Sequence, residues 1–209
     1  MDRRQRQMCI RDRAVTITED LQRVREAQAL VREINMGATA IGTGLNAHPA
    51  YALVVTEKLR QASGVPVVKA ENLVEATQDT GAYVQLSGVL KRVAVKLSKI
   101  SNDLRLLSSG PRAGLGEINL PPMAPGSSIM PGKVNPVIPE VVNQVAFLVI
   151  GNDVTVTMAA EGGQLELNVF EPAMANRLFN SLDTLGRACR ALAQRCVCLL
   201  YTSPSPRDS

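Results

Sequence analysis

The sequence contains few of the side chains that usually mark metal sites, nucleic-acid surfaces and membrane spans. It has one histidine, four cysteines, no tryptophan and 3% aromatic residues in a chain of 209. The cysteines form no CxxC pair and His48 is distant from all of them, so we expect free thiols, no metal site and a reducing, cytoplasmic location. We also see no signal peptide and no apolar run of about 18 residues, and therefore expect no membrane span.

The basic charge is concentrated at one end of the chain. The formal net charge is +4, and five arginines within residues 1–13 supply most of the excess. A basic terminus without interleaved aromatic residues is weak support for nucleic-acid binding, so we expect no nucleic-acid partner.

The spacing of apolar residues predicts helices throughout. With so few aromatic residues the core must be aliphatic, which suits helices packed on helices. Residues 14–34 and 83–107 show apolar side chains at three- and four-residue steps, and Pro49 and Gly64 bracket a short helix over 50–63. Further long helices are expected after Pro136 and from about Ala173. No segment alternates with a period of two, so the sequence predicts an all-α fold, a bundle of long helices.

One polar loop interrupts this helical pattern. The stretch 126–140 reads GSSIMPGKVNPVIPE and offers adjacent hydroxyls, a lysine, an amide and a carboxylate among prolines and glycines. Glycines allow backbone N–H groups to converge, as in anion-binding nests, so such a loop could hold a carboxylate and stabilise additional negative charge on it. On composition alone, an exposed proline–glycine turn with a solvated lysine is the favoured reading, since short motifs often match by chance.

A resemblance favours the first interpretation. GSSIMPGKVNP resembles, without interruption, the signature of the aspartase/fumarase superfamily, and the similarity extends from about Glu33 to Asn168. It implies a central domain of long helices, a homotetramer with active sites shared between subunits, and an elimination that gives fumarate without a metal or organic cofactor. The segment VIPEVVNQV favours the branch that releases ammonia from L-aspartate over fumarate hydratase.

The resemblance also implies a role for each polar residue of the loop. A serine would be the general base, although a free hydroxyl is a weak base and its pKa must be lowered by nearby donors and positive charge. The implied assignments are Ser127 as base, Ser128 with the backbone of Ile129 and Met130 against the developing charge, Lys133 and Asn135 on a substrate carboxylate, and Glu140 as support. Glu140 would pair with a histidine from elsewhere in the site, or serve only its own helix N-terminus; both readings stay open.

The family motifs that supply that histidine and further substrate contacts would lie before residue 14, and His48 does not replace them. Both ends of the chain resemble translated sequencing-adapter sequence. We therefore expect residues 14–198 to be an internal, partial central domain, with the signature loop at 126–136 and non-native tails at 1–13 and 199–209, and expect this piece alone to be inactive. The alternative from another class of function is a helical assembly module that has no catalytic activity.

Overall fold

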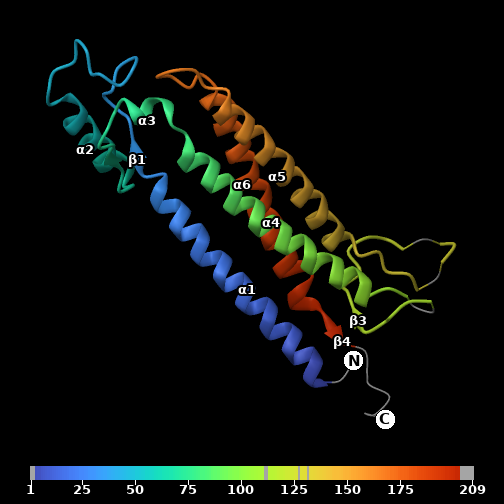
Figure 1. Cartoon of the computed structure of the whole chain (residues 1–209). Helices are drawn as coiled ribbons and strands as arrows, with labels where there is room; N and C mark the ends of the chain where they lie inside the picture. Colours follow the sequence, from blue (N-terminus) through green and yellow to red (C-terminus); the bar gives the residue numbers. More distant parts are fainter. Residues whose placement is uncertain (1–2, 111–112, 127, 131, 203–209) are drawn as a thin grey trace. The chain divides into compact units, whose positions relative to one another are not determined.

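The structure is a computed structural model that describes residues 3–110, 113–126, 128–130 and 132–202, with only the backbone described for 3–10, 201 and 202. Helices dominate this part of the chain (Figure 1), which confirms the all-α prediction. The α-helices are α1 (Arg3–Leu30), α2 (Tyr51–Ser63), α3 (Glu75–Gln78), α4 (Gly81–Leu107), α5 (Val137–Glu161) and α6 (Glu171–Arg195), followed by a 3-10 turn at Val197–Leu199.

Four strands of two residues each accompany the helices. β1 (Glu33–Ile34) pairs in parallel with β2 (Val68–Lys69), and β3 (Ile118–Asn119) pairs antiparallel with β4 (Tyr201–Thr202). The prediction that the first helix continues to Ile34 is wrong. α1 ends at Leu30 because the backbone of Glu33 and Ile34 is used in pairing with a segment more than thirty residues away, a contact that the local pattern cannot reveal.

The chain divides into two compact units, described separately below. Unit 1 contains residues 1–17, 91–150 and 181–209, and unit 2 contains residues 18–90 and 151–180. Each of the four long helices contributes one segment to each unit.

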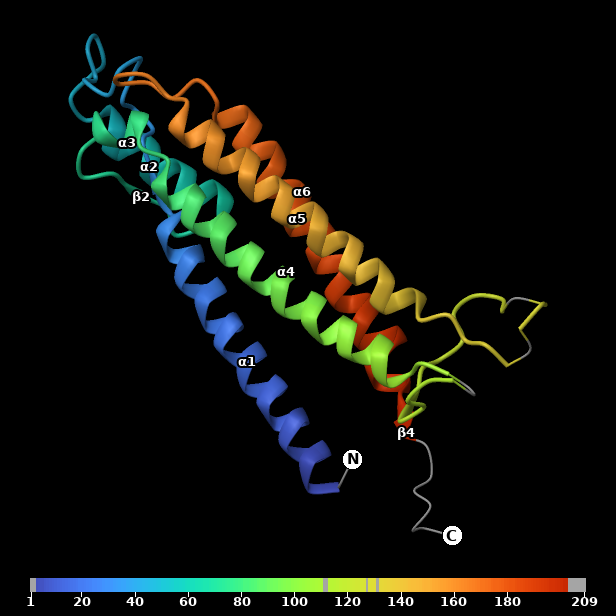
Figure 2. The ribbon, with the colours of Figure 1, turned by 45° about the vertical axis from the view of Figure 1, so that its right-hand side comes forward.

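Unit 1 has an aliphatic core between neighbouring helix segments. The segments of α4, α5 and α6 in this unit lie side by side in both views (Figures 1 and 2). The buried side chains are small or medium in size, which lets the helices approach closely. They include Ala94 and Leu97 of α4, Val142, Ala146 and Val149 of α5, and Leu185, Ala188 and Leu192 of α6.

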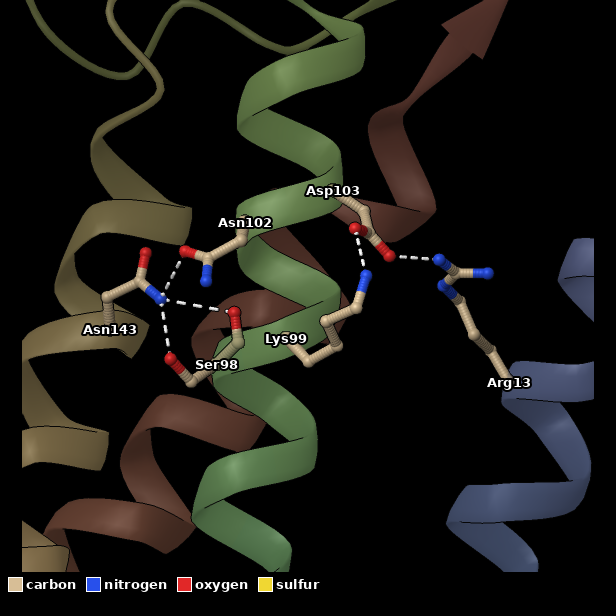
Figure 3. Close-up of polar contacts among 6 residues, drawn as sticks. All are labelled: Arg13, Ser98, Lys99, Asn102, Asp103 and Asn143. Carbon is tan, nitrogen blue, oxygen red and sulfur yellow. Dashed lines mark hydrogen bonds and ion pairs between the residues drawn. The ribbon is translucent and has the colours of Figure 1, made fainter.

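Polar contacts join α1, α4 and α5 within unit 1 (Figure 3). Asp103 of α4 accepts hydrogen bonds from Lys99 of the same helix and from Arg13 of α1. Burial raises the pKa of Asp103, but these bonds and the two positive charges outweigh burial and hold the pKa below its ordinary value. Stability from this cluster is therefore present above the ordinary pKa of an aspartate, and is lost as pH falls through the lowered value.

Unit 2 combines a small apolar core with buried hydrogen bonds. Met174 is 1% exposed and Val156 fully buried. Ser87 of α4 donates to Asp153 of α5 at 2.8 Å, and Asn152 of α5 donates to Asn180 of α6 at 3.0 Å. Buried polar groups that find partners in this way fix how the helix segments face one another.

α5 is apolar enough to raise the question of a membrane span. By length and composition alone it could cross a bilayer, with a hydropathy of 1.3, so the expectation that the chain contains no such run is wrong. Core helices of globular proteins meet the same criterion. α5 buries Asn143, Asn152 and Asp153 in hydrogen bonds to its neighbours, which is the behaviour of a core helix.

Candidate functional site

The signature segment lies in unit 1, in the connection between β3 and α5. Ser128 and Ile129 form an exposed turn, and the Ile129 side chain is 87% exposed. Met130 follows and is also exposed. Ser127, the predicted base, lies outside the described residues.

The two arms of this loop approach each other closely at Gly126 and Lys133. A Cβ atom on Gly126 would stand 2.9 Å from the Lys133 carbonyl oxygen, so a larger side chain there would force the arms apart. Gly132 has φ +83°, a left-handed conformation that glycine adopts without strain. The Lys133 N–H donates to the Met130 carbonyl at 3.2 Å. Two glycines thus close the loop and bring Lys133 back beside its beginning.

The arm that leaves the loop runs directly into α5. Lys133 and Asn135 are partly buried, and the Val137 N–H donates to the Asn135 carbonyl at 2.8 Å. Glu140 lies in the first turn of α5, where a carboxylate is favoured by the helix dipole, and its N–H donates to the Pro136 carbonyl at 3.0 Å. Pro139 lies in the same first turn, as the sequence predicts, since proline is tolerated there, and the structure shows that it is buried.

A small hollow lies beneath this exit arm. Asn135 and Pro136 line it together with Leu120 from the preceding connection and with Arg195 and Cys196 from the end of α6. Its volume of about 10 Å³ is no larger than a single water needs, so it is a packing gap and not a substrate pocket. Arg195 and Cys196 were not predicted to approach the loop, because their contact spans about sixty residues of sequence.

The predicted residues therefore occupy three settings in the described structure. Ser128, Ile129 and Met130 form the exposed tip, Lys133 and Asn135 lie in the exit arm, and Glu140 lies on the helix. His48 is exposed, and its Nδ1 accepts a hydrogen bond from the Ala50 N–H at 3.2 Å, which fits the prediction of an exposed residue before a helix. Among the described side chains, no group of three His, Cys, Asp or Glu residues could hold a metal ion.

Comparison with known proteins shows which family the chain belongs to. The sequence profile of a family described as lyase matches residues 9–151, which is more than half of the chain. The chain belongs to this lyase family. The match includes the whole signature loop and begins inside the segment 1–13 that the sequence suggested is non-native.

Curated members of the lyase family resemble the chain closely. It is 65% identical over 184 residues to aspartate ammonia-lyase of Helicobacter pylori, and 58% identical over 184 residues to aspartate ammonia-lyase of Escherichia coli. Each alignment covers 88% of this chain but only 39% and 38% of the relative. The chain thus spans about two fifths of the length of these relatives.

Solved structures from the lyase family share the fold. A fumarate lyase:delta crystallin from Brucella melitensis, crystallised with cobalt, superposes with a TM-score of 0.89 at 60% identity, covering 92% of this chain and 42% of that one. A class II fumarase from Schistosoma mansoni gives a TM-score of 0.87 at 34% identity, covering 94% of this chain and 44% of that one. These likenesses confirm that the chain is an incomplete helical domain of this fold.

Proposed function

We propose that the chain is the central part of an enzyme that reversibly eliminates ammonia from L-aspartate to give fumarate. The similarity to aspartate ammonia-lyases carries this proposal, since it reaches 65% identity over 88% of the chain. The signature segment supports it, because Ser128, Lys133 and Asn135 lie in a glycine-closed loop that leads directly into α5.

Ser127 would begin the reaction as general base. Its deprotonated Oγ takes the proton from the substrate carbon that is β to the amino group, and the electron pair left behind delocalises into the adjacent carboxylate. When that pair returns, the carbon–carbon double bond of fumarate forms as the carbon–nitrogen bond breaks. The protonated amine leaves with the bonding electrons as ammonia, so the step needs neither a metal nor an organic cofactor.

The rest of the loop would stabilise the charge that develops on the carboxylate. Donors placed where charge appears stabilise the transition state more than the ground state. Ser128 and the backbone of Ile129 and Met130 would serve that purpose at the loop tip. Lys133 and Asn135 would hold a substrate carboxylate, and the approach of Gly126 to Lys133 supports this by keeping the lysine within the closed loop, beside its beginning.

Glu140 keeps two possible roles within the proposal. It would pair with a histidine supplied by a part of the enzyme that precedes this chain, or it would only stabilise the N-terminus of α5. A Glu140→Gln variant separates them, since a pairing role predicts a shifted pH profile of kcat/KM and a capping role predicts only a small loss of stability.

The complete enzyme would be a cytoplasmic homotetramer whose active sites combine residues from several subunits. Residues 14–198 would be its partial central domain, with non-native segments at 1–13 and 199–209. Exposed apolar side chains on the long helices, such as Phe147 at 65% and Phe179 at 70%, support an assembly that covers them. The piece alone would be inactive, since it lacks the histidine and the further substrate contacts.

Two other functions remain to be separated from this one. The likeness to class II fumarase supports a fumarate hydratase. That likeness, at 34% identity, is far weaker than the similarity to aspartate ammonia-lyases, which reaches 65% identity. A helical module without catalysis would keep the fold and lose the chemistry. With the gene completed at both ends, absorbance of fumarate formed from L-aspartate supports the proposal, activity with malate alone supports the hydratase, and no activity supports the module.

Ser127, the proposed base, can be tested by substitution. Ser127→Ala in the completed enzyme should lower kcat by about 10²- to 10⁴-fold, the usual contribution of a positioned acid or base, while the assembly state stays unchanged. Ser63→Ala, at the exposed end of α2, is the matched control and should keep full turnover. Near-normal turnover in Ser127→Ala would show that another group removes the proton.

A further inference from the structure

Asn143 is a buried amide with an unusually complete set of partners. It lies on α5, is 4% exposed, and faces α4 within unit 1 (Figure 3). Its Nδ2 donates to the Ser98 carbonyl at 3.1 Å, to Ser98 Oγ at 2.8 Å and to Asn102 Oδ1 at 3.0 Å. Its Oδ1 accepts from Arg105 Nη1 at 3.2 Å. One side chain therefore contacts three residues on successive turns of α4.

The chemistry of these partners fixes which way the amide points. A backbone carbonyl can only accept, so the atom that faces Ser98 must be the NH₂ group. A guanidinium can only donate, so the atom that faces Arg105 must be the oxygen. Neither leucine nor aspartate can replace both halves, since leucine loses the bonds to half-buried Ser98 and to Arg105, and aspartate sets an oxygen against the Ser98 carbonyl.

The contact joins the two ends of the connection that carries the signature loop. Arg105 lies in the last turn of α4, which ends at Leu107, and α5 begins at Val137. Asn143 is six residues into α5, about 9 Å from its start at the usual helical rise. A slip of one residue would turn α5 by about 100° and move the exit arm with Lys133 and Asn135. A buried polar contact is a known means of fixing such a register.

We propose that Asn143 is a positioning residue that locks the rotation and register of α5 against α4, and so holds the signature loop in its working geometry. This proposal rests on the proposed function, because it assigns the loop a reaction. Asn143 itself touches no substrate. It acts through the start of α5 and through Arg105.

The test compares Asn143 with a second buried amide on the same helix. Asn152 is also 4% exposed and donates to Asn180 at 3.0 Å, but it lies nine residues farther from the loop. In the completed enzyme, Asn143→Leu and Asn152→Leu should both lower the melting temperature. Asn143→Leu alone should speed hydrogen exchange of the amides in 126–136 and lower kcat/KM by roughly ten- to a hundredfold, the range expected from a misplacement of about 1 Å.

A milder variant keeps the proposal testable if Asn143→Leu fails to fold. Arg105 is exposed, so Arg105→Met removes one donor without opening a cavity. It should shift loop exchange and kcat/KM in the same direction by a smaller factor, and the double variant should be no worse than Asn143→Leu, because both remove one interaction.

Three outcomes would overturn the proposal: unchanged loop exchange in Asn143→Leu, equal losses of kcat/KM in the Asn143 and Asn152 variants, or additive losses in the double variant. If the completed wild-type enzyme shows no lyase activity, the proposed function fails, and the exchange measurement alone then decides whether Asn143 holds the loop.

Discussion

The cysteines at the end of α6 differ in how deeply their side chains are buried. Cys196 is 1% exposed, Cys198 is exposed, and both are free thiols. Burial raises the pKa of Cys196, and burial also raises that of Cys189, although Arg190 partly opposes the effect there. Since the thiolate is the reactive form, both burial and the raised pKa slow the reaction of Cys196.

Alkylation should therefore follow a fixed order. In a Cys9→Ser background at mildly alkaline pH, iodoacetamide should label Cys198 first and Cys196 last, as measured by peptide mass spectrometry over time. Raising the pH should speed labelling of Cys196 only at a higher pH than for an ordinary thiol, because its thiolate forms later. After unfolding in denaturant the order should disappear. Equal rates for Cys196 and Cys198 in the folded chain would contradict the burial seen near Asn135 and Pro136.

At the scale of elements, helix ends marked by proline and glycine could be predicted well. The short helix expected over 50–63 is α2, Tyr51–Ser63, and Gly64 ends it with φ 68° and an N–H bonded to Arg60. The seam over 83–107 lies in α4, and the helix after Pro136 is α5. The pairing of β1 with β2 could not be predicted, because it joins backbone segments that are distant in sequence. The short α3 was not predicted either, although its signal is local: Asn72 Oδ1 accepts hydrogen bonds from the N–H groups of Val74 and Glu75.

The candidate site was predictable to the same degree. The signature predicted where the loop lies in the sequence and which polar residues it carries. The structure adds that the loop closes where Gly126 approaches the Lys133 carbonyl oxygen. The contact between Asn143 and Arg105 was not predictable, because it depends on the rotation of two helices separated by the long connection. Periodicity predicts which face of a helix is apolar, but not which polar residue on that face finds a partner.

Gly42, in the connection between β1 and α2, is held tightly against the segment before α3. It has φ +85°, and a Cβ there would stand 2.2 Å from Val74 Cα and 2.5 Å from the Leu73 carbonyl oxygen. These are backbone atoms that cannot rotate away, so Gly42→Ala should cost about 1–3 kcal/mol from overpacking and more from strain. Denaturant unfolding measures the loss.

Two other glycines separate the causes. Gly64→Ala has a similar φ of +68° but open space around it, so it should show the strain alone. Gly88→Ala lies inside α4 with nothing within 4 Å, and it should stabilise the chain by about 0.5–1 kcal/mol through helix propensity. A Gly42→Ala loss equal to that of Gly64→Ala would show that the contact with Val74 is not tight.

Across the whole molecule, the most informative exposed apolar side chains lie on the part of α5 that belongs to unit 2. Val154 and Met158, one turn apart, form an apolar face there and are 58% and 61% exposed. Helices of small proteins rarely expose neighbouring large apolar side chains without a partner. The relatives are about two and a half times as long as this chain, so further chain or further subunits are available to cover this face.

The chain alone should therefore associate through this face. Sedimentation velocity should show species larger than a monomer, growing with concentration, and Met158→Asp should reduce them because a carboxylate opposes burial of the face. Leu45→Asp is the matched control, since Leu45 is 73% exposed but lies in a loop, and it should leave association unchanged. In the completed enzyme Met158→Asp should lower the assembly state with little change in helical circular dichroism. A chain that stays monomeric, or a Leu45→Asp effect as large as that of Met158→Asp, would show that the α5 face is not an assembly surface.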